Sequence, residues 1–105
     1  MLGDKFSLRF TPKFVDDLDK IVDYISVNLH NPESAIKLAN KIEKAIQKRL
    51  GSPLAFEPFK SNRKRKHPYY LIYVDNFTIY YTVIDDVMEV RRVLYGNRDS
   101  DNILE

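Results

Sequence analysis

The sequence predicts an α+β fold in which two helices cover one face of a single small sheet. Three observations carry this prediction. A short stretch near the N-terminus alternates apolar and polar residues, two amphipathic segments with helix-start signals follow it, and three β-prone runs separated by turn signals come last. An N-terminal strand, a helical hairpin and a three-stranded antiparallel meander give this fold, as one domain over residues 1–105.

The first strand is predicted in "KFSLRF", where Phe6, Leu8 and Phe10 alternate with polar residues. Thr11 is then placed as the N-cap of a helix, with Pro12 at the first helical position. The apolar residues that follow recur at helical spacing: Phe14, Val15, Leu18, Ile21, Val22, Ile25 and Leu29. A strand therefore leads directly into an amphipathic helix.

The second helix repeats the same signals. Asn31 is its cap, Pro32 opens it and Gly51 ends it. Its buried face is expected to consist of Ala35, Leu38, Ala39, Ile42, Ala45, Ile46 and Leu50. Because the link between the two helices is so short, the sequence predicts a helical hairpin.

A loop and three strands complete the chain. "SPLAFEPFKSNRKRKHP" contains interior prolines and a basic run, which indicates a loop. "YYLIYV", "FTIYYTVI" and "VMEVRRVLY" are the strands, and the pairs Asp75, Asn76 and Asp85, Asp86 are the turns between them. In "YYLIYV" both alternating sets are apolar, which favours a central position in the sheet.

Composition excludes several classes of protein. The 105 residues include no cysteine, which excludes disulfides and thiolate metal sites and suits a reducing cytoplasm. No apolar stretch matches a secretion signal or the roughly 20 residues of a membrane helix. His30 and His67 show no metal-ligand spacing. We therefore expect a cytoplasmic protein without a metal, another cofactor or a membrane contact.

The charge is unevenly distributed along the chain. The net charge is only +2, but residues 41–66 hold nine Lys/Arg and two Asp/Glu, a net of +7, which leaves −5 elsewhere. Such a local positive potential attracts phosphate or an acidic partner segment. Its "RKRK" run lies beside His67, Tyr69 and Tyr70, a combination that suits nucleic-acid binding. A solvated loop is the alternative interpretation.

The order of elements and the last strands resemble the RelE/ParE superfamily of toxins from bacterial type II toxin–antitoxin modules. The segments that carry the resemblance are "FVDDLDKIVDYI", "NPESAIKLANKIEKAI", "SPLAFEPF" and "DNFTIYYTVIDDVMEVRRVLYGNRDSDNIL". "VLYGNRD" is the most specific, since many members close with Val-Leu, a His or Tyr, Gly, a variable residue and Arg-Asp. The resemblance spans nearly the whole chain and implies a cognate antitoxin as partner.

The resemblance implies two mechanisms. RelE-like members look like ribosome-dependent endonucleases that cut mRNA without a metal, whereas ParE-like members poison DNA gyrase and have no known hydrolytic site. The further partners would be the ribosome and mRNA, or DNA gyrase. Fold alone does not choose between them. We take mRNA cleavage as the leading hypothesis, gyrase poisoning as a near-equal alternative, and an inactive or regulatory antitoxin-binding member as a third.

Cleavage of RNA without a metal needs a base, an acid and cations for the phosphorane. Glu57, in "FEPFK", resembles the general base of the YoeB branch. Arg98 matches the phosphate-binding arginine of RelE-like enzymes, although a surface ion pair is its alternative. Tyr95 is the candidate acid or stacking group, and Arg91 would bind phosphate. The candidate nucleic-acid-binding residues are Lys60, Arg63, Lys64, Arg65, Lys66 and Arg92.

Two features of the last strands limit this hypothesis. On a regular strand, Arg91 and Arg92 point to opposite faces and cannot share a pocket. Arg92 has apolar neighbours, so an arginine held by an internal acid, or one lying along the sheet edge, is as reasonable as a functional one. Thr78 stands where RelE-like enzymes usually carry an arginine, and Tyr95 where several carry a histidine. The missing groups favour the ParE-like alternative.

Overall fold

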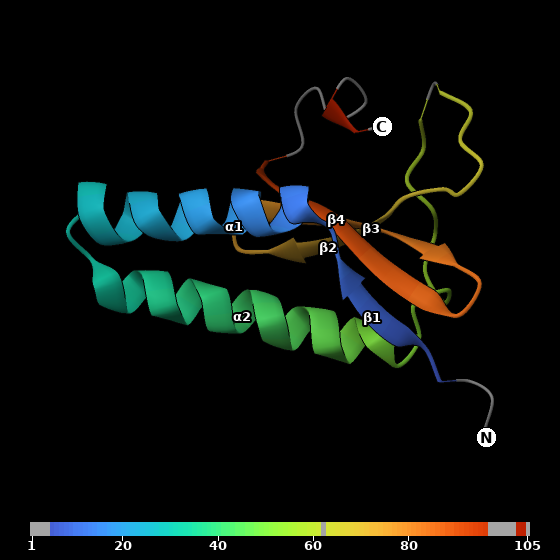
Figure 1. Ribbon diagram of the computed structural model, residues 1–105, viewed down its shortest axis with the longest axis horizontal. Coiled ribbons are helices and arrows are strands. Elements are labelled where there is room, and N and C mark those ends of the chain that lie inside the picture. The colour runs from blue at the N-terminus through green and yellow to red at the C-terminus, as the bar shows by residue number, and fades with distance from the viewer. Residues whose placement is uncertain (1–4, 62, 97–102, 105) are drawn as a thin grey trace.

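The computed structural model describes residues 5–61, 63–96 and 103–104. Its elements, in chain order, are β1 (Ser7–Phe10), α1 (Pro12–Asp23), the π-helix η2 (Tyr24–Asn28), α2 (Pro32–Leu50), β2 (Tyr70–Val74), β3 (Phe77–Ile84) and β4 (Val87–Tyr95). Figure 1 shows this order from the blue N-terminal strand to the orange last strand. The predicted α+β fold is confirmed.

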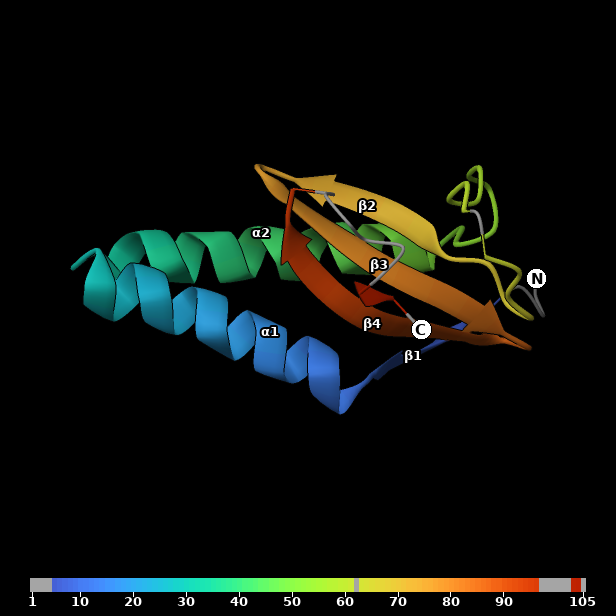
Figure 2. The ribbon, with the colours of Figure 1, turned by 90° about the horizontal axis from the view of Figure 1, so that it is seen from above.

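The strands form one sheet in the order β1-β4-β3-β2. β1 runs parallel to β4, while β2, β3 and β4 pair antiparallel as a meander. Both helices lie together on one side of the sheet, and the segment around residues 103–104 lies on the other (Figure 2). The predicted helical hairpin therefore covers one face of the sheet.

The two faces of the sheet carry separate clusters of buried side chains. The covered face, which packs against the helices, presents Tyr70, Ile72, Val74, Ile79, Tyr81, Met88, Val90 and Val93. The open face, on the opposite side, presents Tyr69, Leu71, Tyr80 and Leu94, with Phe59 and Leu104 packed on them. Apolar residues are thus buried on both sides of the same sheet.

The predicted central position of "YYLIYV" is wrong, because β2 is an edge strand. Its even-numbered residues pack into the helix-covered cluster, while Tyr69 and Leu71 pack on the open face. The apolar residues on both faces of β2 therefore indicate that both faces are buried by other parts of the chain. They do not indicate that β2 has a neighbouring strand on each edge. β3 and β4 are the interior strands.

Both helices begin as predicted. The Thr11 side chain accepts the N–H of Phe14 at 3.2 Å, and the Asn31 side chain accepts the N–H of Ser34 at 3.2 Å. Each cap is followed by proline at the start of its helix. The end of the first helical segment differs, because α1 continues into η2, whose wider turn shifts the apolar stripe. Leu29 at its end is exposed as a result.

The two predicted hairpin turns are confirmed by backbone geometry. Asp75 and Asp85 have φ values of 53° and 56°, in the left-handed region that tight β-turns require. His30, between the helices, has a φ of 52°. Within the described ranges, none of the helices combines the length and apolar character needed to span a bilayer.

Candidate functional site

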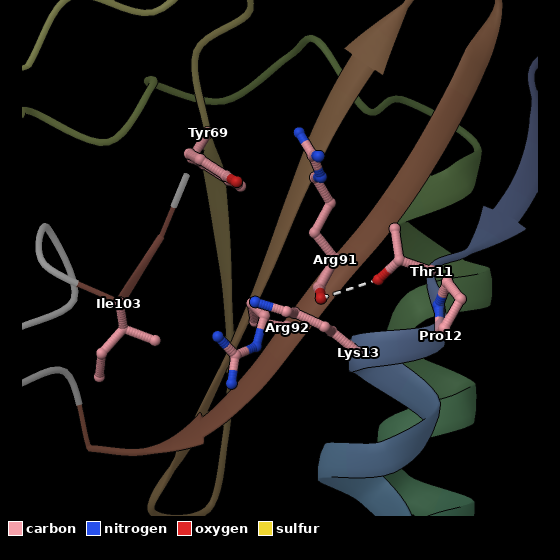
Figure 3. A pocket seen from close by; sticks show the side chains of 7 residues that line it. All are labelled: Thr11, Pro12, Lys13, Tyr69, Arg91, Arg92 and Ile103. Atoms are coloured by element: carbon pink, nitrogen blue, oxygen red, sulfur yellow. Dashed lines mark hydrogen bonds between the residues drawn. The ribbon is translucent and has the colours of Figure 1, made fainter.

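The strand pair β3–β4 contains a β-bulge at Arg91. Tyr80 pairs with Arg92 and Tyr81 pairs with Val90, so Arg91 is the extra residue on β4. Because of this extra residue, Arg91 and Arg92 line the same pocket on the open face (Figure 3). The expectation that they could not do so assumed a regular strand, and the strand is not regular.

The pocket lies where the start of α1, β4, the start of β2 and the C-terminal segment meet, and we call it the arginine pocket. It encloses about 320 Å³ and is lined by Thr11, Pro12, Lys13, Tyr69, Arg91, Arg92 and Ile103. Figure 3 shows Lys13 reaching from α1 toward Arg92, with Tyr69 and Ile103 on the opposite side. Three cationic side chains and a phenol therefore surround one small volume.

Helix α1 braces the bulge through two polar residues. The Thr11 hydroxyl donates to the carbonyl oxygen of Arg91 at 2.9 Å while it accepts the capping N–H of Phe14. Asp17 accepts from the Nε of Arg92 at 2.7 Å and the N–H of Val93 at 3.2 Å. Backbone groups on both sides of the bulge are therefore bound by the helix, which holds the two arginines in place.

Arg92 is bound by an internal acid, as one of the sequence interpretations proposed. Its Nε and Nη2 reach the two carboxylate oxygens of Asp17 at 2.7 and 3.0 Å. The side chains are only 18% and 13% exposed, so this bidentate pair is largely shielded from water. Its charge is balanced within the fold, and a further role of Arg92 in binding nucleic acid stays a prediction.

Arg91 is the more available of the two arginines. Its side chain is 34% exposed, and its ion pair with Glu89 is long, at 3.4 Å. Glu89 is held more closely by Arg9, at 2.8 Å. The Arg91 guanidinium lies 5.9 Å from the centre of the Tyr69 ring. Arg91 can therefore present its charge to a partner at the open side of the pocket.

Tyr69 connects the basic loop to the arginine pocket. The guanidinium of Arg65 lies 5.1 Å from the Tyr69 ring, so this ring contacts two arginines. Arg65 also donates to the Ser61 hydroxyl at 2.6 Å. The N–H of Phe59 donates to the Tyr69 carbonyl at 2.7 Å, which ties the loop to the start of β2. Of the predicted basic loop residues, Arg65 is the one that shares the Tyr69 ring with Arg91, although it does not line the pocket.

The other predicted loop residues face solvent. These are Glu57, Lys60, Arg63, Lys64 and Lys66, all of them exposed. None of the five lines the arginine pocket. Lys60 directly follows Phe59, whose backbone is bound to Tyr69, so the chain passes close to the aromatic cluster at this point. Glu57 has no contact that places it beside the two arginines.

Tyr95 lies away from the arginine pocket, and the bulge explains why. Beyond the extra residue the alternation of β4 is inverted, so Val93 packs into the covered-face core. Tyr95 is 69% exposed and packs edge-on against Phe77 at 5.5 Å. It lines an apolar cleft of about 470 Å³ with Ile21, Tyr24, Ile25 and Leu29 of the helical hairpin. The structure therefore does not bring Tyr95 together with Arg91.

Thr78 and Arg98 are the two remaining positions that the sequence singled out. Thr78 is 2% exposed and pairs with Leu94 across the sheet. Arg98 lies outside the described residues. Within the part of the chain that the structure describes, no group of three His, Cys, Asp or Glu residues is arranged to hold a metal ion.

A second polar network closes the far end of the molecule, on the covered face. The Tyr81 hydroxyl donates to the Pro53 carbonyl at 2.7 Å and accepts from Arg49 at 3.0 Å. Burial raises the pKa of Tyr81 above its ordinary value, and the hydrogen bond and charge of Arg49 oppose part of that rise. Arg49 also lies 3.5 Å from the centre of the Phe56 ring. This network fixes the start of the long loop and belongs to the fold.

Sequence reasoning did not assign Thr11, Lys13 or Asp17 to a site, and it noted Tyr69 only as an aromatic neighbour of the basic run. Thr11 was recognised only as a helix cap, and its second hydrogen bond depends on a contact with a residue 80 positions away. Asp17 reaches Arg92 over a separation of 75 positions. No local pattern contains these contacts. The signal that was present is the pair of adjacent arginines on a β-strand.

Comparisons with known proteins agree with this fold. The family model described as the ParE toxin of the type II toxin–antitoxin system, parDE, matches residues 8–100. That match extends from β1 through both helices and the whole meander. A search of curated proteins returned no match.

Several solved structures have a similar fold. A chain of the chromosomal ParDE TA system from P. aeruginosa is 22% identical, with 90% of this chain and 99% of that one covered and a TM-score of 0.70. A chain of the archaeal RelE–RelB complex from Pyrococcus horikoshii OT3 is 12% identical, with 90% of this chain and 98% of that one covered and a TM-score of 0.60. YafQ from E. coli strain BL21(DE3) is 12% identical, with 86% of this chain and 92% of that one covered and a TM-score of 0.53.

At these identities the solved structures establish the fold, and the family model establishes membership. The predicted membership of the RelE/ParE superfamily is confirmed. The chain belongs to the family of ParE toxins of type II toxin–antitoxin systems.

Proposed function

We propose that this toxin inhibits DNA gyrase by binding to it, without cutting nucleic acid itself, and that a cognate antitoxin neutralises it. The observation that carries the proposal is the composition of the arginine pocket. It offers cations and a phenol, while the carboxylates beside it, Asp17 and Glu89, are each engaged by arginine. The match to the ParE family supports the same conclusion.

Acid–base catalysis would need a proton acceptor beside the cations. Among the described residues, Asp17 is held by Arg92 and Glu89 by Arg9. Glu57 lies in the exposed loop and does not line the pocket. Thr78, at the position where RelE-like enzymes usually carry an arginine, is buried and has no charge to offer a phosphorane. These placements favour binding over hydrolysis.

The arginine pocket has the chemistry of a protein-binding surface. Arginine and tyrosine are the residue types that most often anchor protein interfaces. Arg91 can form a charge-assisted hydrogen bond with a carboxylate or carbonyl of a partner, and Tyr69 holds its guanidinium in place. Because Thr11 and Asp17 hold the bulge, the partner does not have to order this part of the toxin.

A cognate antitoxin is supported by the similar structures, which are a ParDE system and a RelE–RelB complex. The helical hairpin also offers an apolar groove of about 350 Å³ between α1 and α2. Its lining includes Phe10 and Val15, which are large apolar side chains exposed to solvent. A partner that covers this groove would remove apolar surface from water.

The decisive experiment measures both targets with the same preparation. Purified chain is added to a gyrase supercoiling reaction that reports linear, enzyme-linked DNA, and to a translating ribosome mixture in which mRNA ends are mapped. We expect loss of supercoiling and an increase in linear DNA, with intact transcripts. Addition of the antitoxin encoded beside the gene restores supercoiling.

Transcript cuts that depend on the ribosome, with normal supercoiling, would contradict the proposal. In that case Glu57→Ala tests the predicted base and Lys60→Ala the predicted phosphate contact, since both side chains are exposed and their loss leaves the fold intact. A chain that leaves growth, transcripts and supercoiling unchanged would instead be the inactive or regulatory member.

A further inference from the structure

Helix α2 carries a row of lysines along its outer side. Lys37, Lys41, Lys44 and Lys48 are spaced by four, three and four residues, which places them on one face of the helix. All four are exposed. At a rise of about 1.5 Å per residue the row, which we call the lysine stripe, spans roughly 16 Å.

The lysine stripe is almost free of internal partners. Only Lys41 has an ion pair, with Asp75 at 3.2 Å, while Lys37, Lys44 and Lys48 have none with any residue that the structure describes. Like charges at this spacing weaken a helix. On α1, by contrast, the same spacing joins opposite charges, in the pair Lys20–Asp16 at 3.1 Å. Three of the four lysines therefore leave their charge unpaired among the residues that the structure describes.

The surroundings of the lysine stripe reinforce its charge. Residues 41–66 carry a net charge of +7, and Glu43 is one of the two acids among them. Glu43 is turned away from the stripe, because it lines the groove between the two helices. Asn40 and Gln47 line the same groove. Glu33, an exposed acid one turn before Lys37, stands at the N-terminal end of the row. The exposed row itself consists of lysines, and the one large apolar side chain exposed on this helix in the described chain, Ile36, lies outside the row.

We infer that the lysine stripe binds the phosphate backbone of double-stranded DNA. A protein partner is disfavoured, since protein interfaces are built around apolar or aromatic anchors that this face does not have. A row of roughly 16 Å is long enough to run beside more than one phosphate of a duplex, in which each strand carries one negative charge per about 3.4 Å of helix axis. Contacts of this kind position a protein on a duplex without reading its sequence.

The choice of DNA over RNA rests on the proposed function, because gyrase holds a DNA duplex while it works. In this arrangement the arginine pocket contacts the enzyme and the lysine stripe contacts the DNA beside it. The two surfaces belong to different elements, since the pocket is built by α1, β4, β2 and the C-terminal segment, and the stripe by α2. Each surface can therefore be altered separately.

The test measures binding of the full chain to a fluorescein-labelled DNA duplex of arbitrary sequence, without gyrase, over a range of salt concentrations. Lys37→Gln/Lys44→Gln is compared with the matched control Lys5→Gln/Lys20→Gln, which removes two exposed lysines elsewhere. At about 0.9 per lost phosphate contact, the slope of log K against log salt should decrease by about 2 in the stripe variant only. Glutamine keeps the helix, which circular dichroism verifies.

Three results would overturn the inference: an unchanged slope in the stripe variant, an equal decrease in the control, or tighter binding of single-stranded RNA or polyglutamate than of the duplex. Failure of the proposed function looks different. If gyrase is unaffected while the duplex is bound through the stripe, the inference stands and the proposed function fails. If gyrase is inhibited equally by wild type and stripe variant, and neither binds the duplex, the proposed function stands and the inference fails.

Discussion

The two faces of the sheet differ in how regular they are. On the covered face, side chains from β2, β3 and β4 meet the helices in one continuous cluster. On the open face, a bulge, a tethered loop and a C-terminal contact surround the arginine pocket. The core thus follows the repeat of the secondary structure, whereas the candidate site lies where that repeat is broken.

Helix α1 belongs to both faces. Phe14 is buried in the covered-face core, while Thr11 and Asp17 bind the backbone around Arg91 and Val93. The same helix therefore contributes to the core and to the shape of the pocket. Substitutions in the core should lower the stability without a specific effect on the pocket. Substitutions in the brace, by which we mean Thr11 and Asp17, should lower the stability and also disturb the pocket.

The largest expected effect is on the covered face. Ile46→Ala removes a side chain that is nearly fully buried against the sheet, and should lower the free energy of unfolding by about 2–5 kcal/mol. Urea denaturation measures it. The matched control is Ile36→Ala on the same helix, where the side chain is exposed and the change should be below about 0.5 kcal/mol. Equal losses would refute the assignment of the buried face.

The next effect is in the brace. Asp17→Ala removes the carboxylate that pairs with the shielded Arg92 guanidinium and accepts the Val93 N–H, at a cost of about 2–4 kcal/mol. In an Arg92→Met background the same change should cost clearly less, because no buried charge is left behind. A double-mutant cycle by urea denaturation measures the difference. Identical costs in the two backgrounds would show that the pair is not coupled.

A smaller effect distinguishes the two helix caps. Thr11→Ala and Asn31→Ala each remove a cap that is followed by proline, worth about 1 kcal/mol. Only Thr11 also binds the carbonyl of Arg91, so its loss should additionally shift the NMR signal of the Arg91 Nε–H group. If Asn31→Ala shifts that signal as much, the hydrogen bond from Thr11 does not hold the bulge.

The smallest effect concerns alkaline pH. Because the pKa of Tyr81 is raised by burial, the unfolded chain loses the phenol proton at lower pH than the folded chain does. The contribution of the Tyr81 phenol to the free energy of unfolding is fully present below about pH 10. It is lost as the pH rises through the higher pKa of Tyr81 in the folded chain. Tyr81→Phe should remove this decrease of the thermal unfolding temperature at alkaline pH. At neutral pH it should lower the free energy of unfolding by about 1 kcal/mol. Tyr73→Phe, at an exposed edge position, should keep it.

Sequence reasoning found most of the covered face, because its signals are local. Helix caps, prolines at the first turn and apolar residues at helical spacing place α1 and α2, and the paired acidic residues place the hairpin turns. The edge position of β2 was missed, because residues outside the meander, Phe59 and Leu104, cover its second face. The spacing of apolar residues along a strand indicates which of its faces are buried. It does not indicate which strands lie next to it in the sheet.

The candidate site was only partly predictable for a related reason. Arg91 was a candidate from the sequence, and its convergence with Arg92 depends on how β4 pairs with β3. The same bulge moves Tyr95 toward the helices. Arg65 differs from its basic neighbours through its contacts with Tyr69 and Ser61. Each of these facts is set by contacts distant in sequence.

One measurement tests the central claim, that a bulge on the open face builds a binding site separate from the core. Arg91→Ala is compared with wild type by urea denaturation and by the gyrase supercoiling reaction. We expect a stability change below about 1 kcal/mol, together with a loss of inhibition of at least about tenfold. Full inhibition by a stably folded Arg91→Ala chain would contradict the account.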